Sequence, residues 1–553
     1  MIINFSADGR RMALSFPYDP TLLDIVRTLP DGRRWNATSR FWVAPVTRDN
    51  LRHLVETRVA DDAVVARLTE MDTPLAKPES PDAREFKTRP YQHQAAGYAM
   101  AMANERLALW WEQGTGKTWC GANVIQARIR AGLVKRVLVI APKTVLTSWM
   151  GELAKHTDLT GVVIQGKRRD QIATAAQVAL INYELLIPMA KVLQAQPWDM
   201  IILDESYYIK GISAQRTKIA WALCSKIRYR MLLCGSPVAN GPEDLFAQYR
   251  ALDDGETFGT SFYAFRAKFW ENRSRGPFPD WQLKSGAMDA IRERMFLRGH
   301  RVTKADCFDL PAKTYQVRHV EMEPEQARIY RQIERDLVAE FDDGRLTAGT
   351  AAVALVRLNQ ITSGYVPDDA GRVREIGHRK LDALADILQD KRKAVVWCLF
   401  RHDVAAITER FAAMNPVVIS GDVPLADRAK GIERFQADPA CRLFVGQVHA
   451  GGIGITLTAA QDVVYYSQGY SLIDRAQSED RTHRIGTTGT VTYVDLVCPG
   501  TVDEDILQAL EEKRGVADQI TGDIANTILQ RLRSRNPSAL SGAKSAPRDK
   551  EVA

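Results

Sequence analysis

The segment Gly114–Thr118 reads GTGKT and stands between an apolar run and a helical pattern. Glycines let backbone N–H groups close around phosphate oxygens, and the N-terminus of a helix favours negative charge. A lysine after the second glycine can reach the outer phosphates of a nucleotide, and a following threonine can bind Mg²⁺. The full phosphate-loop pattern is incomplete, because Trp111 stands where its first glycine belongs. A plain glycine-rich turn is the competing interpretation, but the strand before and the helix after it favour a nucleotide site made by Gly114, Thr115, Gly116, Lys117 and Thr118.

Two carboxylates, Asp204 and Glu205, follow the apolar run Met200–Leu203. At the carboxyl edge of a parallel sheet such residues lie where ligands bind. We predict that Asp204 holds Mg²⁺ together with Thr118, and that Glu205 polarises the water that attacks ATP. The pair could instead cap the strand or the next helix. Its position after the phosphate loop, within the same alternation of strands and helices, favours the catalytic interpretation.

Arg481 and Arg484 lie three residues apart in the charged segment Gln477–Gly486, on what the pattern predicts to be a helix start. Phosphoryl transfer spreads charge over the γ-phosphate oxygens, and an arginine delivered from a second domain can stabilise that charge. We therefore predict that both arginines act in hydrolysis. The competing interpretation is a solvated, charged helix face. His483, between them, is predicted to be structural.

These residues need two sets of elements to position them. Short apolar runs alternate with helical patterns twice along the chain, as in parallel sheets that are covered on both faces. Each set predicts one α/β lobe. The expected strands are 107–110, 137–141, 178–182, 200–203 and 230–234 in the first lobe, and 394–398, 416–420, 442–445, 463–466 and 490–494 in the second.

The remaining segments complete the domain plan. Short alternating runs followed by amphipathic stretches predict a small α+β domain at the start of the chain. A polar, proline-bearing stretch predicts a linker, and a tail of low apolar content predicts disorder. The predicted parts are residues 1–60 (the small domain), 61–83 (the linker), 84–310 (the first lobe), 311–379 (an inter-lobe segment with protruding helices), 380–533 (the second lobe) and 534–553 (a disordered basic tail).

Composition excludes several classes of protein. A chain of 553 residues is too long for one hydrophobic core. The net charge of +7, from 74 Lys+Arg against 67 Asp+Glu, permits a polyanionic partner without establishing one. The seven cysteines lie far apart and form no CxxC pair, which argues against a disulfide framework or a zinc knuckle. Without a signal peptide or a run of about 20 apolar residues, we expect a soluble protein, cytoplasmic in a bacterial or phage-infected cell and nuclear in a eukaryote.

With these elements in this order, the chain resembles the superfamily-two helicases, and within them the Swi/Snf-type DNA translocases. The resemblance implies two tandem RecA-like lobes, ATP as the nucleotide and Mg²⁺ as the metal. It extends over residues 88 to 520. The segments that carry it are Arg89–Gln92 (RPYQ), Ala141–Thr144 (APKT), Leu180–Glu184 (LINYE), Cys234–Asn240 (CGSPVAN), Thr303–Lys313 and Ala450–Thr458 (AGGIGITLT).

The resemblance also implies roles for individual residues. Gln92 is expected to contact the adenine, and Gly452 and Gln477 are expected to contribute to the nucleotide site from the second lobe. One departure is Tyr207, which stands where the family usually has a histidine with a coupling role, while the Mg²⁺ and base positions are intact. The residues expected to track DNA, or to couple it to the ATP site, are Lys143, Thr144, Ser148 and Asn240 in the first lobe and Thr456 and Thr458 in the second.

The small domain at residues 1–60 contains nine arginines, no lysine and six acidic residues. Its segments Phe16–Pro20, Arg33–Trp35 and Phe41–Pro45 resemble the HARP-like domain of annealing helicases. Arginine suits both phosphate contact and stacking, and exposed aromatic rings can stack on unpaired bases. The competing interpretation is that these rings form the core of a very small domain. Our hypothesis is that the domain recognises branched DNA or single-to-double-strand junctions.

The predicted function is that of an ATP-dependent translocase or helicase that moves along duplex or forked DNA and remodels or anneals it. An RNA or single-strand helicase is the alternative within the same class. An ATP-gated nucleic-acid-binding scaffold without turnover is the alternative from another class, and the presence of all five candidate catalytic residues weighs against it. We expect a monomer that binds DNA and no membrane, and the sequence indicates no particular protein partner.

Overall fold

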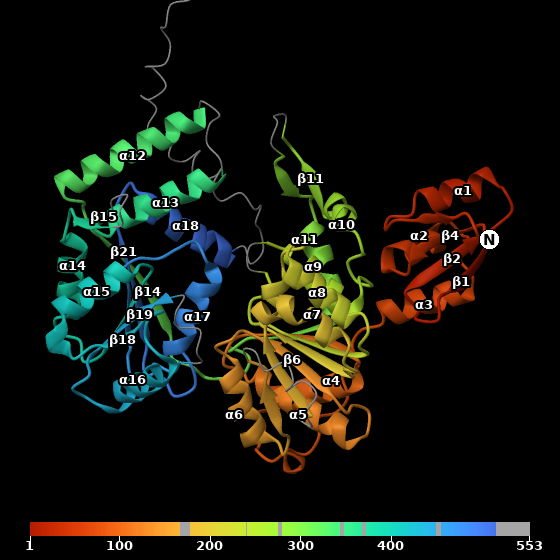
Figure 1. Cartoon of the computed structure of the whole chain (residues 1–553), viewed down its shortest axis with the longest axis horizontal. Helices are drawn as coiled ribbons and strands as arrows, with labels where there is room; N and C mark the ends of the chain where they lie inside the picture. The colour runs from red at the N-terminus through yellow and green to blue at the C-terminus, as the bar shows by residue number, and fades with distance from the viewer. Residues whose placement is uncertain are drawn as a thin grey trace, which may run out of the picture. The chain divides into compact units, whose positions relative to one another are not determined.

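The computed structural model in Figure 1 describes residues 1–165, 177–238, 241–274, 279–342, 348–367, 372–448 and 455–515. The chain divides between Asp309 and Leu310 into two compact units. The first unit contains the small N-terminal domain and the first α/β lobe, and the second contains the second lobe and its helical insertion. In the described part of the chain, none of the helices combines the length and the apolar character that a membrane crossing requires.

The first lobe is built on a seven-stranded sheet whose paired strands are parallel, in the order β13-β5-β10-β9-β6-β8-β7. Strands such as β6 and β9 are apolar and buried along their whole length, as expected when helices cover both faces of a sheet. The strands are β5 (Arg106–Trp111), β6 (Val137–Ala141), β7 (Gly161–Val163), β8 (Val178–Asn182), β9 (Met200–Asp204), β10 (Tyr229–Leu233) and β13 (Gly299–Val302).

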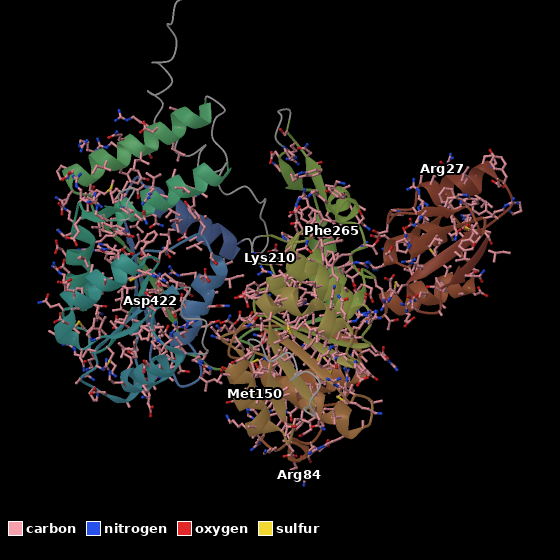
Figure 2. All side chains as sticks on the ribbon, in the orientation of Figure 1. Arg27, Arg84, Met150, Lys210, Phe265 and Asp422 are labelled. Atoms are coloured by element: carbon pink, nitrogen blue, oxygen red, sulfur yellow. The ribbon has the colours of Figure 1, made fainter. Side chains whose placement is uncertain are left out.

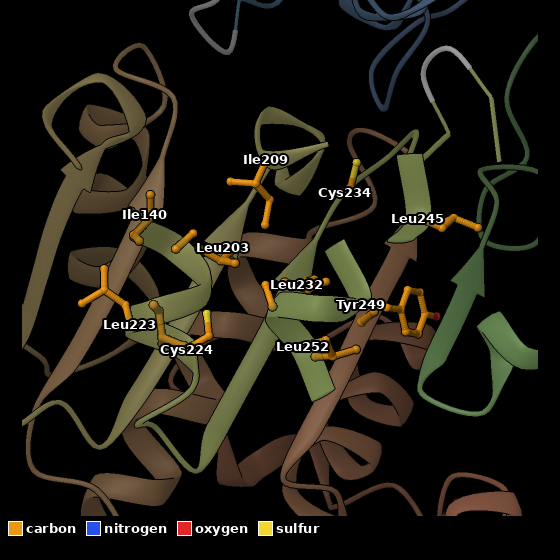
Figure 3. Packing of buried hydrophobic residues seen from close by; sticks show 14 of the residues in the cluster. Ile140, Leu203, Ile209, Leu223, Cys224, Leu232, Cys234, Leu245, Tyr249 and Leu252 are labelled. Carbon is orange, nitrogen blue, oxygen red and sulfur yellow. The ribbon is translucent and has the colours of Figure 1, made fainter. Parts of the chain in front are cut away.

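Helices pack on this sheet and enclose two buried clusters. In the cluster of Figure 3, Leu203 of β9 and Leu232 of β10 lie among side chains of the covering helices, including Leu223 and Leu252. The helices of this lobe are α4 (Gln92–Ala103), α5 (Lys117–Arg130), α6 (Leu146–His156), α7 (Leu186–Gln194), α8 (Gln215–Cys224), α9 (Asp244–Asp253), α10 (Phe262–Phe269) and α11 (Ala287–Phe296), and a hairpin is formed by β11 (Trp270–Asn272) and β12 (Trp281–Leu283).

The second unit contains a six-stranded parallel sheet in the order β14-β21-β20-β17-β19-β18. The helices α12 and α13 pack with α18 around their own apolar cluster, which includes Leu358 and Ile506. The strands are β14 (Lys313–His319), β17 (Ala394–Cys398), β18 (Val417–Ile419), β19 (Leu443–Gln447), β20 (Asp462–Tyr465) and β21 (Val491–Val497), with a small hairpin of β15 (Tyr365–Pro367) and β16 (Val373–Glu375). The helices are α12 (Pro324–Asp342), α13 (Ala348–Thr362), α14 (Arg379–Leu388), α15 (Arg401–Arg410), α16 (Leu425–Ala437), α17 (Leu472–Thr482) and α18 (Val502–Gly515).

The N-terminal domain is a four-stranded antiparallel sheet, in the order β1-β2-β4-β3, packed with three helices. Its core is aliphatic and includes Leu14, Val26 and Leu51. The hairpin of β3 and β4 forms one edge, where Trp35 keeps 46% of its surface exposed although its ring lies 5.4 Å from that of Trp42. The elements are β1 (Ile2–Phe5), β2 (Arg11–Ser15), β3 (Arg34–Asn36), β4 (Phe41–Pro45), α1 (Pro20–Arg27), α2 (Arg48–Glu56) and α3 (Asp62–Asp72).

Charged groups join this domain to the first lobe. Arg294 of α11 donates to Asp49 of α2 at 2.7 and 3.0 Å, and Lys268 of α10 pairs with the same carboxylate. Glu256 accepts from Arg67 of α3 at 2.9 Å. Although burial raises the pKa of the Asp49 carboxyl, the two cations beside it lower that pKa to about 2. The domain is therefore fixed to the lobe by partly buried ion pairs.

The predicted fold of two α/β lobes with parallel sheets is confirmed, and all ten strands expected in them are present within a few residues of the expected bounds. Two expectations are corrected. The linker expected at residues 61–83 begins with a helix, α3, because Asp61 caps it by accepting from the backbone N–H of Val64 at 2.9 Å. The inter-lobe segment expected at 311–379 begins with β14, which pairs with β21 inside the second sheet. The tail at 534–553 lies outside the described residues.

Candidate active site

The predicted phosphate loop connects the end of β5 to the first residue of α5. Gly114 and Gly116 adopt φ values of 79° and 87°, a left-handed conformation that residues with a Cβ rarely adopt. The ammonium of Lys117 donates to the carbonyl of Trp111 at 2.9 Å, and the hydroxyl of Thr115 donates to the carbonyl of Glu112 at 2.7 Å. The loop is therefore closed by its own hydrogen bonds, and Lys117 stands at the start of α5. At this end of a helix, free backbone N–H groups favour the binding of an anion.

Side chains of α4 support the loop from outside. His93 contacts the carbonyl of Thr115 at 2.7 Å, and the amide of Gln94 donates to the same carbonyl at 3.2 Å. A Cβ at Gly116 would lie 2.0 Å from the Gln94 amide nitrogen, so the glycine is needed for space as well as for its φ angle. Gln92, the predicted adenine contact, is exposed at the start of the same helix. Gln94 therefore supports the loop, and Gln92 lies on the surface beside it.

The last segment of the first unit also reaches the phosphate loop. The backbone N–H of Lys304 donates to the Glu112 carboxylate at 2.8 Å, and the Lys304 side chain lies 3.8 Å from where a Cβ on Gly114 would stand. The ring of Phe308 packs edge-on against Tyr91, with 5.3 Å between centroids, and likewise contacts His93. This segment brings a buried lysine and an aromatic cluster to the nucleotide-binding end of the sheet.

The acidic pair lies at the end of β9, two strands from β5 in the sheet order. The indole of Trp149 donates to the Asp204 carboxylate at 2.7 Å, and the hydroxyl of Tyr183 donates to the Asp204 carbonyl at 2.8 Å. Burial raises the pKa of the Asp204 carboxyl, while the Trp149 hydrogen bond and the charge of Lys117 act in the opposite direction. The phosphate loop and the acidic pair adjoin at this edge of the sheet, because Gln113 of the loop contacts Glu205.

Glu205 turns away from the strand. Its φ of 51° and ψ of 54° are left-handed values, which are uncommon for a residue with a side chain. The amide of Gln113, in the phosphate loop, donates to the Glu205 carboxylate at 3.5 Å. Strained backbone of this kind concentrates at functional sites. The turn directs the carboxylate of Glu205 toward the phosphate loop.

The residues present fit Mg²⁺. The metal prefers hard oxygen ligands and is bound through one or two protein oxygens together with the phosphates of the nucleotide. Asp204 supplies a carboxylate that is 4% exposed, and Thr118 supplies a hydroxyl from the first turn of α5. The donor set therefore agrees with the chemistry of a nucleotide-bound magnesium ion.

Three of the four predicted DNA-contacting residues of the first lobe follow β6 in the chain. Lys143 is exposed just before α6, while Thr144 and Ser148 are half-buried. Trp149, the next residue of α6, is the donor to Asp204, so the helix that carries Ser148 also contacts the candidate metal ligand. Asn240 lies outside the described residues.

In the second lobe, the structure corrects the position of the predicted arginines. Ser471 caps α17 and the helix ends at Thr482, so Arg481 lies in its last turn and Arg484 lies beyond it, not at a helix start. Arg484 donates to the hydroxyl of Thr456 at 3.0 Å. Burial lowers the pKa of the Arg481 guanidinium to about 10, and this group lies over the ring of Trp397.

Gln477 and the backbone before Thr458 lie close to Arg481, whose carbonyl accepts from the N–H of Leu457 at 2.8 Å. The carbonyl of Gln477 accepts from Arg481 at 3.2 Å, and the hydroxyl of Thr458 accepts from Gln436 at 3.2 Å. The structural role predicted for His483 agrees with its contact to the carbonyl of Pro311 at 2.7 Å. Gly452 lies outside the described residues.

Comparison with known families agrees with this geometry. A model described as the SNF2-related domain matches residues 91–363, and a model described as the helicase conserved C-terminal domain matches residues 379–486. The chain is an SNF2-type superfamily-two ATPase. The predictions of an ATP-hydrolysing enzyme and of two RecA-like lobes are thereby confirmed.

Several curated proteins are similar to this SNF2-type ATPase. A SWI/SNF-related matrix-associated actin-dependent regulator of chromatin subfamily A-like protein 1 homolog from Caenorhabditis elegans is 26% identical, over 93% of this chain and 75% of its own. The DNA annealing helicase and endonuclease ZRANB3 of Mus musculus is 27% identical over 82% of this chain, which spans 42% of that protein. Putative protein p41 of Acyrthosiphon pisum secondary endosymbiont phage 1 is 26% identical over 78% of this chain and 97% of its own. A solved SWI2/SNF2 ATPase core from Sulfolobus solfataricus is 25% identical over 84% of this chain and 98% of its own, with a TM-score of 0.38.

Sequence reasoning missed three residues around the nucleotide site of this SNF2-type ATPase. Gln94 stands two positions after the predicted Gln92, and helical spacing alone does not tell which of the two faces the loop. Lys304 and Phe308 fall inside the segment Thr303–Lys313, for which the sequence predicts no contact with the phosphate loop. The signal that could have located them is β13, a short strand of mixed polarity whose pairing with β5 brings residue 302 beside residue 111.

Proposed function

We propose that this SNF2-type ATPase couples ATP hydrolysis to movement along duplex DNA and acts on branched DNA. The observation that carries the proposal is the bond from Trp149 to Asp204, since it joins the helix of the candidate DNA contacts to the candidate metal ligand. The name of a similar protein, a DNA annealing helicase, supports DNA as the polymer.

Each step of hydrolysis has a candidate side chain in the first lobe. Lys117 would leave its contact with the Trp111 carbonyl to neutralise the outer phosphates of ATP. Asp204 and Thr118 would hold Mg²⁺, which when bound neutralises charge on the phosphates. Glu205 would accept a hydrogen bond from the attacking water and later its proton, since its turned backbone directs it toward the loop.

The second lobe would supply positive charge to the transition state. Arg481 and Arg484 lie in the last turn of α17 and just after it, and Arg484 contacts Thr456, a candidate DNA-tracking residue. An arginine that approaches the γ-phosphate only when the lobes close would make hydrolysis depend on lobe movement. Gln477, in the same helix, would take part in binding the nucleotide.

Contacts to the DNA backbone would come from residues at the edges of both lobes. Lys143 is exposed and charged, Thr144 and Ser148 offer hydroxyl groups beside it, and Thr456 and Thr458 offer the same chemistry in the second lobe. Such contacts go to phosphates and carry no sequence information, so binding would be salt-dependent and blind to sequence.

The N-terminal domain would recognise the branch. Its β3–β4 edge carries the exposed Arg33, Arg34 and Arg40 and the half-exposed ring of Trp35. Arginine binds phosphates, and an exposed indole can stack on an unpaired base. Since the domain is fixed to the first lobe through Asp49 and its partners, this edge would be carried along with that lobe.

Point substitutions test this role without disturbing the ion pairs to the lobe. Trp35→Ala with Arg34→Ala should weaken binding to forked DNA by about tenfold or more, because stacking contributes about 1–3 kcal/mol per base. Hydrolysis stimulated by plain duplex should be unchanged. The matched control is Arg27→Ala, which replaces an exposed arginine of α1 that is labelled in Figure 2. This variant should retain fork binding. Equal affinity of the double variant and the control for forked DNA would contradict the assignment.

Movement itself is tested by displacement of a triplex-forming strand from duplex DNA. The proposal predicts displacement that requires ATP and leaves the two duplex strands paired. An RNA or single-strand helicase would instead be stimulated by RNA or single strands and would separate the strands of a partial duplex. Displacement that is equally fast with a non-hydrolysable nucleotide would contradict the proposal.

A further inference from the structure

A buried pair of polar side chains links the acidic pair to the segment that follows β10. Ser206, directly after Glu205, donates its hydroxyl to the amide oxygen of Gln248 at 2.6 Å. The amide nitrogen of Gln248 donates to the carbonyl of Pro237 at 2.7 Å and to that of Asp244 at 3.0 Å. Ser206 and Gln248 are both fully buried.

The direction of these bonds is fixed by their chemistry. The carbonyls of Pro237 and Asp244 can only accept, so the nitrogen of the Gln248 amide must face them. The amide oxygen then faces Ser206, whose hydroxyl can donate. A glutamate at position 248 could not donate to Pro237, and a leucine could make none of the three bonds.

A polar pair at this place costs free energy that an apolar pair would avoid. The helix that carries Gln248, α9, is otherwise packed into the apolar cluster of Figure 3, where Leu245, Tyr249 and Leu252 are labelled. Burying an amide and a hydroxyl is unfavourable unless each is hydrogen-bonded. Apolar side chains would serve packing alone, so the pair indicates a specific connection between two segments.

The two connected segments belong to different parts of the candidate mechanism. On one side, Ser206 begins the 3₁₀ turn Ser206–Ile209 and follows the residue proposed to polarise water. On the other side, Pro237 belongs to the segment Cys234–Asn240 after β10, in which the family resemblance implies that Asn240 tracks DNA or couples it to the ATP site. Ser206 makes this connection one position before Tyr207, the position at which the family resemblance implies a coupling histidine.

We propose that Gln248 is a positioning residue that transmits the state of the segment around Pro237 to Glu205, through Ser206. Movement of the Pro237 carbonyl on DNA binding would shift the amide of Gln248, and the amide would shift the turn that orients the Glu205 carboxylate. The inference rests on the proposed function, because it concerns how DNA stimulates hydrolysis.

The test compares basal and duplex-stimulated hydrolysis in Gln248→Leu and Ser206→Ala. The ratio of stimulated to basal kcat should fall about tenfold in each, a loss of about 1.4 kcal/mol of coupling, with the KM for ATP unchanged. The double variant should lose no more than either single variant, because both substitutions break the same connection. Additive losses, or an equal fall of the basal and stimulated rates, would overturn the inference.

A matched control separates coupling from simple loosening of α9. The indole of Trp221 donates to the carbonyl of Ala247, the neighbour of Gln248, at 2.8 Å. Trp221→Phe removes that bond and should leave the ratio of stimulated to basal kcat unchanged. A tenfold fall in this control would overturn the inference as well.

Different results would contradict the role of Gln248 and the proposed function. If duplex DNA stimulates the wild-type protein and Gln248→Leu equally, the inference fails and the proposed function stands. If no nucleic acid stimulates the wild-type protein, the proposed function fails and the inference fails with it.

Discussion

The two lobes supply their candidate catalytic charges in different ways. In the first lobe, Lys117 comes from one segment and the adjacent Asp204 and Glu205 from another, and a parallel sheet brings the two segments to one edge. In the second lobe, Arg481 lies on a single helix, α17, which also carries the deeply buried Arg475. In the first lobe, the order of the strands brings the charged residues together. In the second lobe, Arg475 fixes the helix α17, on which Arg481 lies.

Arg475 shows what a structural arginine looks like in this protein. It pairs with both oxygens of Asp495, donates to Glu479 at 2.8 Å, and lies 3.6 Å from the centroid of the Tyr465 ring. Arg484, by contrast, is only half-buried and contacts the neutral hydroxyl of Thr456. Deep burial between two carboxylates marks an arginine that stabilises the fold, whereas a partly exposed arginine at a lobe surface can turn to a phosphate.

The largest expected effect sharpens this contrast. Arg484→Ala should lower the nucleic-acid-stimulated kcat by about 10³-fold or more, the usual contribution of an arginine that stabilises the γ-phosphate. The midpoint of unfolding in urea should not change. The control is Arg410→Ala, which replaces an arginine of α15 that pairs with Asp382 on the surface. This variant should retain activity. Full activity of Arg484→Ala would remove this residue from the mechanism.

Arg475 should give the opposite result. Arg475→Met leaves the carboxylates of Asp495 and Glu479 buried without their cation, so the free energy of unfolding should fall by about 3–5 kcal/mol. Arg410→Met breaks an exposed pair and should cost less than about 1 kcal/mol. Chemical denaturation measures both. If Arg475→Met lost activity without losing stability, Arg475 would act in hydrolysis like Arg484, and its assignment as a structural arginine would be wrong.

In the first unit, a smaller stability effect is expected at the joint between the N-terminal domain and the lobe. The pKa of Asp49 is lowered to about 2 in the folded protein, so its ionised form stabilises the fold above pH 4. The stabilisation is lost as the pH falls from about 4 to about 2. Asp49→Asn should therefore lower the free energy of unfolding at pH 7 by about 2 kcal/mol, and the difference from wild type should close in acid.

The exposed Asp24 of α1 provides the control, and Asp24→Asn should have no comparable effect. A difference between Asp49→Asn and wild type that persists unchanged down to pH 2 would contradict the assignment of this stability to the ionised carboxylate.

The smallest effect concerns Trp149, whose indole N–H donates to the candidate metal ligand Asp204. Trp149→Phe removes the hydrogen bond that opposes the raised pKa of Asp204, so that pKa should rise further. Because Mg²⁺ needs the ionised carboxylate, the concentration of Mg²⁺ for half-maximal hydrolysis should increase by about tenfold. The increase should be larger at lower pH. The same Mg²⁺ dependence in variant and wild type at every pH would show that the indole has no part in the site.

The sequence predicts best the positions of those candidate site residues that depend on a single segment of the chain. Gly114 and Lys117 follow from a local pattern, and Asp204 follows from the end of an apolar strand. Their meeting follows from the rule that ligands bind at the carboxyl edge of a parallel sheet. The helices are less predictable at their ends, as α17 shows, because charged residues are equally compatible with a helix start, a helix end and a solvated face.

What the sequence does not predict depends on contacts between distant segments. Lys304 reaches the phosphate loop only because β13 pairs with β5, and nothing within the four residues of β13 indicates its partner. Gln248 is one of several polar residues of α9, and nothing in the sequence of that helix distinguishes it from a residue that faces solvent. The helix α3 (Asp62–Asp72) is different. Its capping residue Asp61 and the helix-forming residues after it are local signals, so the sequence alone is enough to predict this helix.

The most direct test of the account is ATP hydrolysis measured alone and with duplex, forked and single-stranded DNA and RNA, beside a Glu205→Gln variant. The account predicts that duplex and forked DNA raise kcat by about tenfold or more over the basal rate, and that Glu205→Gln abolishes hydrolysis while nucleotide binding persists. A rate that no nucleic acid changes, or full activity of the Glu205→Gln variant, would contradict it.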